Sequence, residues 1–134
     1  MGIEKIDFSP LSVFVKELGD CLIIKDVKDK SSFKLLLTHE NIKISSIVID
    51  SKTKYKNNEI IEYVNVVSFD TVKKYQGYRY GKVLFMTLYD FLASCNCYHY
   101  ITGVYANGDP KLAKYYKELG CMINTNDFRF TRML

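Results

Sequence analysis

The clearest chemical pattern in the sequence lies between residues 75 and 82, which read Tyr-Gln-Gly-Tyr-Arg-Tyr-Gly-Lys. Gly77 and Gly81 stand directly before a segment with helical periodicity, and Arg79 and Lys82 add positive charge. Glycine lets a backbone approach a ligand closely. A helix N-terminus presents amides without a helical partner and the positive end of a dipole. The segment therefore predicts a phosphate-binding loop, although the same residues also suit an ordinary turn before a helix.

A second pattern lies between residues 109 and 120, which read DPKLAKYYKELG. Asp109-Pro110 is typical of a helix start, and Gly120 of a helix end. Tyr116 stands four residues before that glycine, and a tyrosine hydroxyl can hold or donate a proton. The chain has 11 tyrosines, so this pattern taken alone favours packing over catalysis.

Taken together, the two segments resemble the GNAT acyltransferase superfamily. The Gln/Arg-x-x-Gly-x-Gly/Ala loop of that superfamily corresponds to Gln76–Gly81, and its Tyr-x-x-x-Gly helix corresponds to Tyr116–Gly120. The resemblance runs from about residue 60 to the end of the chain. It implies an α/β (α+β) fold with a mixed, largely antiparallel central sheet flanked by helices. It also implies acetyl-CoA as co-substrate and no metal.

A narrower resemblance is to the glucosamine 6-phosphate N-acetyltransferases. It includes the loop, the sequences Ile61-Glu-Tyr-Val64 and Cys97-Tyr-His99, and Arg132 near the C-terminus. It implies direct acetyl transfer to the amine of glucosamine 6-phosphate, a step of UDP-N-acetylglucosamine biosynthesis. Another amine acceptor (a protein N-terminus, a polyamine or an aminoglycoside) and a degenerate, non-catalytic binding domain remain as alternatives.

The resemblance assigns a role to each candidate site residue. Tyr116 would protonate the leaving thiolate, and Glu62 would orient the sugar or relay the amine proton. The main chain at Val64 and Val66 would pair with the pantetheine arm. Arg132 would hold the sugar phosphate across a dimer interface, and Asn107 would replace an asparagine of the family. The pyrophosphate would bind to Gln76, Gly77, Tyr78, Arg79, Tyr80, Gly81 and Lys82.

Three departures from the family pattern affect these roles. Arg79 replaces the second loop glycine, so either this position has a compatible backbone angle or the loop binds differently. Tyr63 replaces an aspartate. The segment between Val66 and Gln76 is about five residues longer than in the family, so the strand register near the thioester is open.

Basic residues in the C-terminal part favour a phosphorylated acceptor over a cationic one: Lys111, Lys114, Lys117, Arg129 and Arg132.

The elements that must position these residues follow from hydrophobic patterning. A short helix is expected over residues 11–18, after Ser9-Pro10. An antiparallel meander of four strands should follow, with polar segments such as 50–59 between them. From Gly81 onward the apolar residues recur at helical spacing. The predicted strands cover residues 21–25, 33–37, 42–49, 60–69, 98–105, 121–123 and 128–133.

Composition limits the remaining possibilities. A length of 134 residues, 48% of them hydrophobic, suits a single domain over residues 1–134, helped by homodimer formation. No apolar run reaches the length of a membrane span, and the first residues do not resemble a signal peptide. The four cysteines form no metal-binding spacing and favour reduced thiols.

Charge and residue bias complete the sequence-based expectations. The net charge is +4, and 16 of the 19 basic residues are lysines. The excess of Lys, Ile, Asn and Tyr indicates A/T-rich codons, so the lysine excess is weak evidence for any partner. Part of the positive charge clusters at Arg79, Lys82 and Arg132, where the resemblance places a pyrophosphate and a sugar phosphate, so we expect no nucleic-acid partner. Without an apolar span we also expect no membrane partner. The expected location is the cytoplasm, or the host cytoplasm for a large DNA virus.

Overall fold

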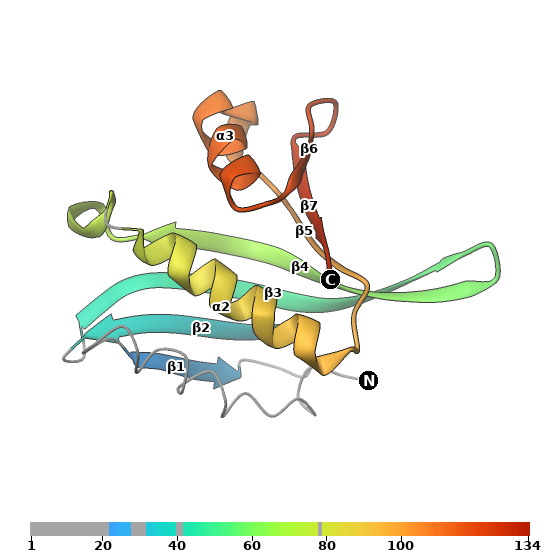
Figure 1. Cartoon of the computed structure of the whole chain (residues 1–134), viewed down its shortest axis with the longest axis horizontal. Helices are drawn as coiled ribbons and strands as arrows, with labels where there is room; N and C mark the ends of the chain where they lie inside the picture. The colour runs from blue at the N-terminus through green and yellow to red at the C-terminus, as the bar shows by residue number, and fades with distance from the viewer. Residues whose placement is uncertain (1–21, 28–31, 40–41, 78) are drawn as a thin grey trace.

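The structure is a computed structural model that describes residues 22–27, 32–39, 42–77 and 79–134. The helix expected over residues 11–18 and the loop residue Tyr78 lie outside the described residues. The described strands form a seven-stranded sheet in the order β1-β2-β3-β4-β5-β7-β6 (Figure 1). The elements are β1 (Leu22–Val27), β2 (Ser32–His39), β3 (Ile42–Lys56), β4 (Glu59–Thr71), α2 (Tyr80–Cys95), β5 (Tyr100–Val104), α3 (Pro110–Glu118), β6 (Met122–Asn124) and β7 (Arg129–Met133).

Strand pairing confirms the predicted mixed, largely antiparallel sheet. Strands β1 to β4 form an antiparallel meander, and β7 pairs antiparallel with both β5 and β6. The parallel contact between β4 and β5 has only three residue pairs, from Val64↔Ile101 to Val66↔Gly103. The sheet therefore consists of a four-stranded part and a three-stranded part joined by a short seam.

The expected polar separator over residues 50–59 is wrong. Strands β3 and β4 continue through it as a long hairpin, paired as far as Lys56↔Glu59, and this hairpin projects beyond the rest of the sheet (Figure 1). Only Asn57 and Asn58 form the turn, with φ of 52° and 65°. Asparagine tolerates these left-handed angles and favours two-residue hairpin turns. Both faces of this ribbon are largely solvent-exposed, so it lacks the alternation that marks a half-buried strand.

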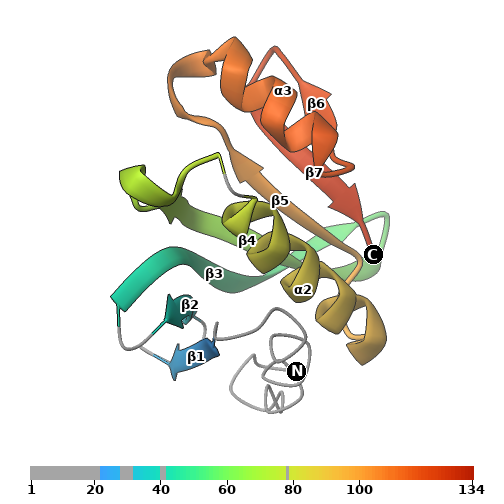
Figure 2. The ribbon, with the colours of Figure 1, turned by 60° about the vertical axis from the view of Figure 1, so that its left-hand side comes forward.

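Both described α-helices pack on one face of the sheet (Figure 2). Helix α2 was predicted from its apolar spacing, and it buries Leu84, Phe85 and Leu88. Helix α3 begins as predicted, because the Asp109 carboxylate accepts a hydrogen bond from the amide of Lys111 at 2.9 Å. One core cluster joins these helices to alternate residues of β3, β4, β5 and β7. The helices therefore bridge the two parts of the sheet.

Candidate active site

The main pocket of the described residues lies where the end of β4, the N-terminus of α2 and one side of α3 meet. Its volume is about 410 Å³. Six of the residues predicted from the sequence line it, and they come from the loop and from α3: Gln76, Gly77, Arg79, Tyr80, Gly81 and Tyr116. The other lining residues are Phe69, Asp70, Thr71, Tyr75, Lys111, Leu112 and Tyr115. The structure thus brings the two sequence motifs to one cavity.

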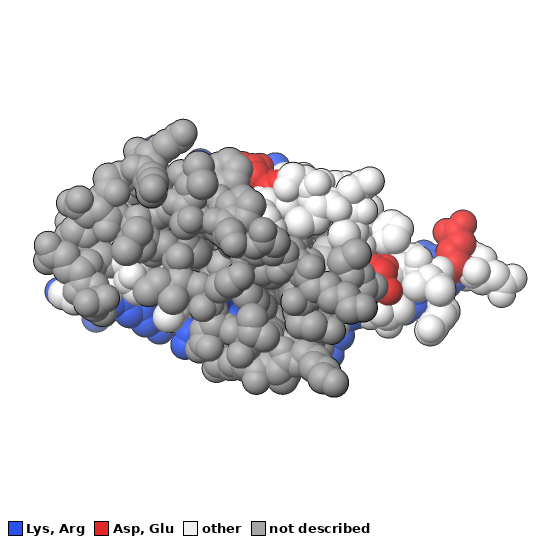
Figure 3. Space-filling view, turned by 90° about the horizontal axis from the view of Figure 1, so that it is seen from below, with Lys and Arg blue, Asp and Glu red and all other residues white. Residues whose placement is uncertain are grey.

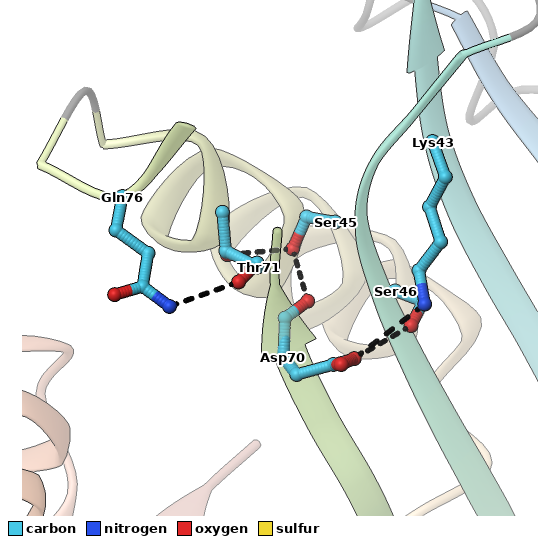
Figure 4. Close-up of polar contacts among 6 residues, drawn as sticks. All are labelled: Lys43, Ser45, Ser46, Asp70, Thr71 and Gln76. Carbon is cyan, nitrogen blue, oxygen red and sulfur yellow. Dashed lines mark hydrogen bonds and ion pairs between the residues drawn. The ribbon is translucent and has the colours of Figure 1, made fainter. Parts of the chain in front are cut away.

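Side-chain hydrogen bonds fix the end of β4 and the loop that follows it (Figure 4). The Gln76 amide nitrogen Nε2 donates to the carbonyl of Thr71 at 3.0 Å, so this side chain anchors the loop to the strand. Ser45 Oγ donates to the carbonyl of Asp70 at 2.9 Å. The Asp70 carboxylate accepts from Ser46 Oγ at 3.2 Å and lies 3.7 Å from the Lys43 ammonium. Because Asp70 is engaged with β3, its negative charge is partly balanced beside the pocket.

The N-terminus of α2 has the geometry of an anion site. Its first helical hydrogen bond runs from the amide of Val83 to the carbonyl of Arg79, and no side chain caps the helix. The amides of Gly81 and Lys82 therefore have no helical partner. Arg79 has φ 67° and Gly77 has φ 89°, both in the left-handed region. This confirms the expectation that an unusual backbone angle is needed where Arg79 replaces glycine.

Close packing explains Gly81. A Cβ at this position would lie 2.7 Å from the Tyr115 hydroxyl and 3.0 Å from Thr71 Oγ1. These distances are shorter than van der Waals contact, so a larger residue would require the Tyr115 and Thr71 side chains, or α2 itself, to move. The loop glycine therefore keeps the N-terminus of α2 close to the pocket.

The free edge of β4 begins beyond the two valines expected to pair with a ligand arm. Val64 and Val66 are paired with β3 on one side and with β5 on the other. Residues 67–71 continue along β3 but have no strand partner on the β5 side among the described residues. Val67 is an extra residue, because Ser68 pairs with Val48 and Val66 pairs with Ile49. Main-chain groups that could pair with a ligand arm thus lie at 67–71, nearer the end of the strand than Val64 and Val66.

Two adjacent tyrosines of α3 face this pocket. The Tyr116 ring is 7% exposed and stacks on Phe130 with a centroid distance of 3.8 Å. Burial raises the pKa of Tyr115 to about 12 and raises that of Tyr116 further, with the neighbouring Tyr115 adding to the shift of Tyr116. Neither hydroxyl has a hydrogen-bond partner among the described residues. Both hydroxyls stay protonated at neutral pH, as a proton donor requires.

The structure does not bring six of the predicted residues to the pocket: Val64 and Val66, which are paired on both sides, and Glu62, Lys82, Asn107 and Arg132. Glu62 lies seven residues before Phe69, roughly 23 Å along the strand, where both carboxylate oxygens accept from Thr53 Oγ1 at 3.1 Å. Lys82 and Asn107 are exposed and outside the lining. The Arg132 guanidinium donates to the carbonyl of Leu119 at 2.8 Å and stacks 3.7 Å from the Tyr89 ring centre.

Sequence reasoning missed several residues of the lining. Lys111 and Leu112 belong to the first turn of α3, so the predicted helix start already indicated their position. Tyr115 precedes Tyr116, and both face the cavity. Phe69 and Thr71 were missed because the register at the end of β4 depends on the extra residue Val67, which no local pattern marks. Among the described residues no group of three or more His, Cys, Asp or Glu side chains is placed to hold a metal ion.

The described helices include none with the length and apolar character that a bilayer crossing requires. The sequence matches no protein-family model and no curated protein. Solved structures do match. The KacTA–DNA complex aligns with a TM-score of 0.64 at 10% identity, covering 79% of this chain and 70% of that chain. A Tyr-to-Phe mutant of the toxin AtaT, bound to the C-terminus of the antitoxin AtaR and acetyl-CoA, aligns with a TM-score of 0.62 at 12% identity. The alignment covers 76% of this chain and 67% of that chain.

A third match is Arabidopsis thaliana Naa50 in complex with the bisubstrate analogue CoA-Ac-MVNAL. Its TM-score is 0.57 at 17% identity, covering 75% of this chain and 72% of that chain. The expectation that nucleic acid is excluded as a partner is wrong, because this fold occurs in a complex that contains DNA. The mixed seven-stranded sheet with both described helices on one face is the fold of the GNAT acetyltransferases.

Proposed function

We propose that this chain is an acetyl-CoA-dependent N-acetyltransferase that transfers the acetyl group directly to an amine. The observation that carries the proposal is one pocket that combines three features. These are the uncapped N-terminus of α2, the unpaired end of β4 and the buried hydroxyl of Tyr116. Each feature suits a different part of acetyl-CoA, and together they form a site for a thioester of that kind. Matched structures that contain acetyl-CoA or a CoA analogue support the proposal.

The charges of the pocket suit a diphosphate. The amides of Gly81 and Lys82 and the side chains of Arg79 and Lys111 surround the N-terminus of α2. A helix N-terminus and nearby cations favour phosphate groups. The main chain at 67–71 offers the unpaired donors and acceptors that an extended amide-containing arm needs for strand-like pairing.

Acetyl-CoA, when bound, supplies the activated acetyl group. An amide of the open end of β4 can donate to the acetyl oxygen as negative charge grows there. Tyr116, which is protonated at neutral pH, holds the proton that the departing sulfur requires. No cysteine lines the described part of the pocket. Burial also raises the pKa of the nearest candidate, Cys121, to about 11, so a covalent acetyl-cysteine step is disfavoured.

As acceptor we propose glucosamine 6-phosphate, which the sequence resemblance supports. A peptide N-terminus is the second candidate, because one matched structure holds a CoA-linked acetyl-peptide analogue. The two acceptors differ in charge and size, so a direct comparison separates them. The choice between these acceptors is a separate question from acetyl-CoA binding, and it is tested separately.

The test has two stages. Isothermal titration with acetyl-CoA should show saturable binding. A thiol-release assay with acetyl-CoA and an amine panel should then show turnover. The panel contains glucosamine 6-phosphate, glucosamine, a peptide with a free N-terminus, spermidine and an aminoglycoside. Turnover with glucosamine 6-phosphate alone supports the proposed acceptor, whereas turnover with the peptide alone replaces it. No binding of acetyl-CoA overturns the proposed function as a whole.

A matched pair of substitutions on α2 tests the location of the site. Gly81→Val places a side chain where a Cβ already comes 2.7 Å from the Tyr115 hydroxyl, so acetyl-CoA binding should fall at least 10-fold. Ala93→Val adds similar bulk on the exposed side of the same helix and should leave binding unchanged. Equal affinities for the two variants would place acetyl-CoA elsewhere.

A further inference from the structure

A second pocket lies on the sheet face opposite the helices. Val64, Ile101 and Phe130 point into the core with the helices, so their alternate neighbours on β4, β5 and β7 point to the other face. Several of these neighbours, with Lys54 of β3, surround a pocket of about 370 Å³. Its lining is Lys54, Tyr63, Tyr100, Thr102, Arg129 and Thr131. We call it the outer pocket, and it shares no lining residue with the pocket on α2.

A hydrogen-bond network beneath the outer pocket holds Arg129. Thr102 is 3% exposed, and its hydroxyl donates to the carbonyl of Phe130 at 2.9 Å. Thr131 Oγ1 lies 3.0 Å from the same hydroxyl. Arg129 Nη1 donates to Thr102 Oγ1 at 3.3 Å, and its Nε lies 3.6 Å from the Asp127 carboxylate. Nη2 has no partner among the described residues, so one donor edge of the guanidinium is left for a ligand.

The second cation has no carboxylate partner. The Lys54 ammonium lies over the rings of Tyr63 and Tyr100, 5.7 and 5.2 Å from their centres, and no described carboxylate is within 4.0 Å of it. The two rings stack with a centroid distance of 5.0 Å and an interplanar angle of 14°. A cation over aromatic rings is held weakly enough to move onto an anion. The pocket therefore pairs an available positive charge with a flat aromatic wall.

We propose that the outer pocket is a second ligand site, for a small molecule that carries a phosphate group and a ring. Lys54 and Arg129 approach the pocket from different strands and can share one tetrahedral anion. Tyr63 and Tyr100 provide the surface against which the ring packs. The volume suits a small molecule.

The surrounding charges are consistent with an anionic ligand. Seen from below, Lys and Arg side chains show mainly along the lower edge of the described surface (Figure 3). Two carboxylates lie near the outer pocket, Asp127 on Arg129 and Asp50, which is 4.0 Å from the Lys52 ammonium. Each of them has a cationic partner, so neither occupies Lys54. The proposal goes beyond the acetyltransferase function and holds whether or not the α2 pocket binds acetyl-CoA.

Titrations of the full chain at low salt test the proposal with three probes: inorganic phosphate, glucosamine 6-phosphate and adenosine monophosphate. The two ring-bearing probes distinguish a sugar phosphate from a nucleotide. We expect at least one of them to bind about 10-fold more tightly than inorganic phosphate, and Tyr100→Leu to remove that difference. Lys54→Gln should weaken the better probe about 10-fold, and Arg129→Gln should do the same.

The control is Lys52→Gln, which removes a cation two residues along the same face of β3 but outside the outer pocket. It should leave the affinity within twofold of the unchanged protein. Circular dichroism establishes that each variant folds. If Arg129→Gln does not fold, Lys54→Gln still tests the pocket, because it alters an exposed side chain. Acetyl-CoA is titrated into the same samples, so failure of the proposed function is seen separately. The proposal is overturned by no saturable binding of any probe, by equal weakening in the Lys52 variant, or by unchanged affinity in the Lys54 variant.

Discussion

At the residue scale, the adjacent side chains of Tyr115 and Tyr116 are packed differently. The Tyr116 ring is stacked parallel to Phe130 at 6° and is almost fully buried. The Tyr115 hydroxyl lies at the N-terminus of α2, beside Gly81. Tyr116 therefore has a fixed ring plane, and a hydroxyl on a fixed ring is better suited to deliver a proton to one defined atom. Tyr115 is placed to support the phosphate end of the pocket.

Tyr116→Phe should lower kcat about 100-fold or more while the free energy of unfolding changes little. The stack on Phe130 is retained, and only the proton donor is lost. Steady-state kinetics with saturating acetyl-CoA measure the first effect, and urea unfolding measures the second. Tyr115→Phe should raise KM for acetyl-CoA and lower kcat less. A larger loss of kcat in the Tyr115 variant would mean that Tyr115, and not Tyr116, is the proton donor.

Cys121 should make the protein less stable as the pH rises above about 9. Burial raises the pKa of this thiol from 9.0 to about 11, with Arg132 opposing the shift in part. Below pH 9 the thiol is protonated in both states, and its contribution is complete. Between pH 9 and 11 the unfolded chain loses the proton first, so the free energy of unfolding falls by at most about 1.4 kcal/mol per pH unit.

Urea unfolding at several pH values tests this sign. Cys121→Ala should flatten the curve between pH 9 and 11, whatever it costs at pH 7. Tyr115→Phe should flatten it at higher pH, between 10 and 12, because burial raises the pKa of that tyrosine from 10.0 to about 12. A Cys121→Ala curve parallel to that of the unchanged protein would show that this thiol does not contribute to the loss of stability.

At the element scale, the N-terminus of α2 combines backbone strain with charge. Arg79 sits at φ 67°, a conformation that costs a residue with a Cβ about 1–2 kcal/mol and glycine much less. Arg79→Gly should therefore raise the free energy of unfolding by about 0.5–1 kcal/mol. The same change removes a cation from the pocket lining, so acetyl-CoA affinity should fall about 3- to 5-fold.

Opposite signs of these two effects are the decisive result. Urea unfolding and isothermal titration at two salt concentrations measure them, and the loss of affinity should shrink at high salt. Lys73→Gln is the matched control, because it removes an exposed cation of the neighbouring 3-10 turn that does not line the pocket. An Arg79→Gly variant with unchanged or higher affinity would show that this side chain does not contact the ligand.

The same scale shows how far sequence reasoning reaches. Helix starts were predictable because Asp109-Pro110 and the apolar spacing after Gly81 are local signals. The extension of β3 to Lys56 was not, because both faces of that ribbon are largely exposed; only Asn57-Asn58 marked its turn. The loop residues that line the pocket were predicted from their glycines, their charges and the family resemblance. Phe69 and Thr71 depend on strand register, which is set by pairing with β3 over a long sequence separation.

At the scale of the whole molecule, the sheet depends on contacts that cross its seam. Strands β4 and β5 share only three residue pairs, so the side chains packed beneath the two helices add to the connection between the four-stranded and three-stranded parts. The core cluster contains residues of both parts and of both helices. The pocket on α2 lies where the two parts separate, so a loss of contact across the seam should change the geometry of this pocket.

Arg132 makes the polar part of this connection, and it gives the last prediction. From β7, its guanidinium donates to the carbonyl of Leu119 at the end of α3, contacts Met86 Sδ at 3.1 Å and stacks on Tyr89 of α2. Arg132→Met keeps much of the packing but removes the donor and the charge. The free energy of unfolding, measured in urea, should fall by about 2–3 kcal/mol.

The same substitution separates this structural role from the one that the sequence resemblance implies. If Arg132 holds the sugar phosphate, its substitution should raise KM for glucosamine 6-phosphate and leave KM for free glucosamine, which has no phosphate, unchanged. If Arg132 instead holds α3 against α2, its substitution should lower the free energy of unfolding. It should also change the kinetics with both acceptors equally, because Tyr116 lies on α3. Since the Arg132 guanidinium is already engaged with Leu119, Met86 and Tyr89, we expect the equal effect. An acceptor-specific rise in KM with unchanged stability would restore the phosphate-binding role.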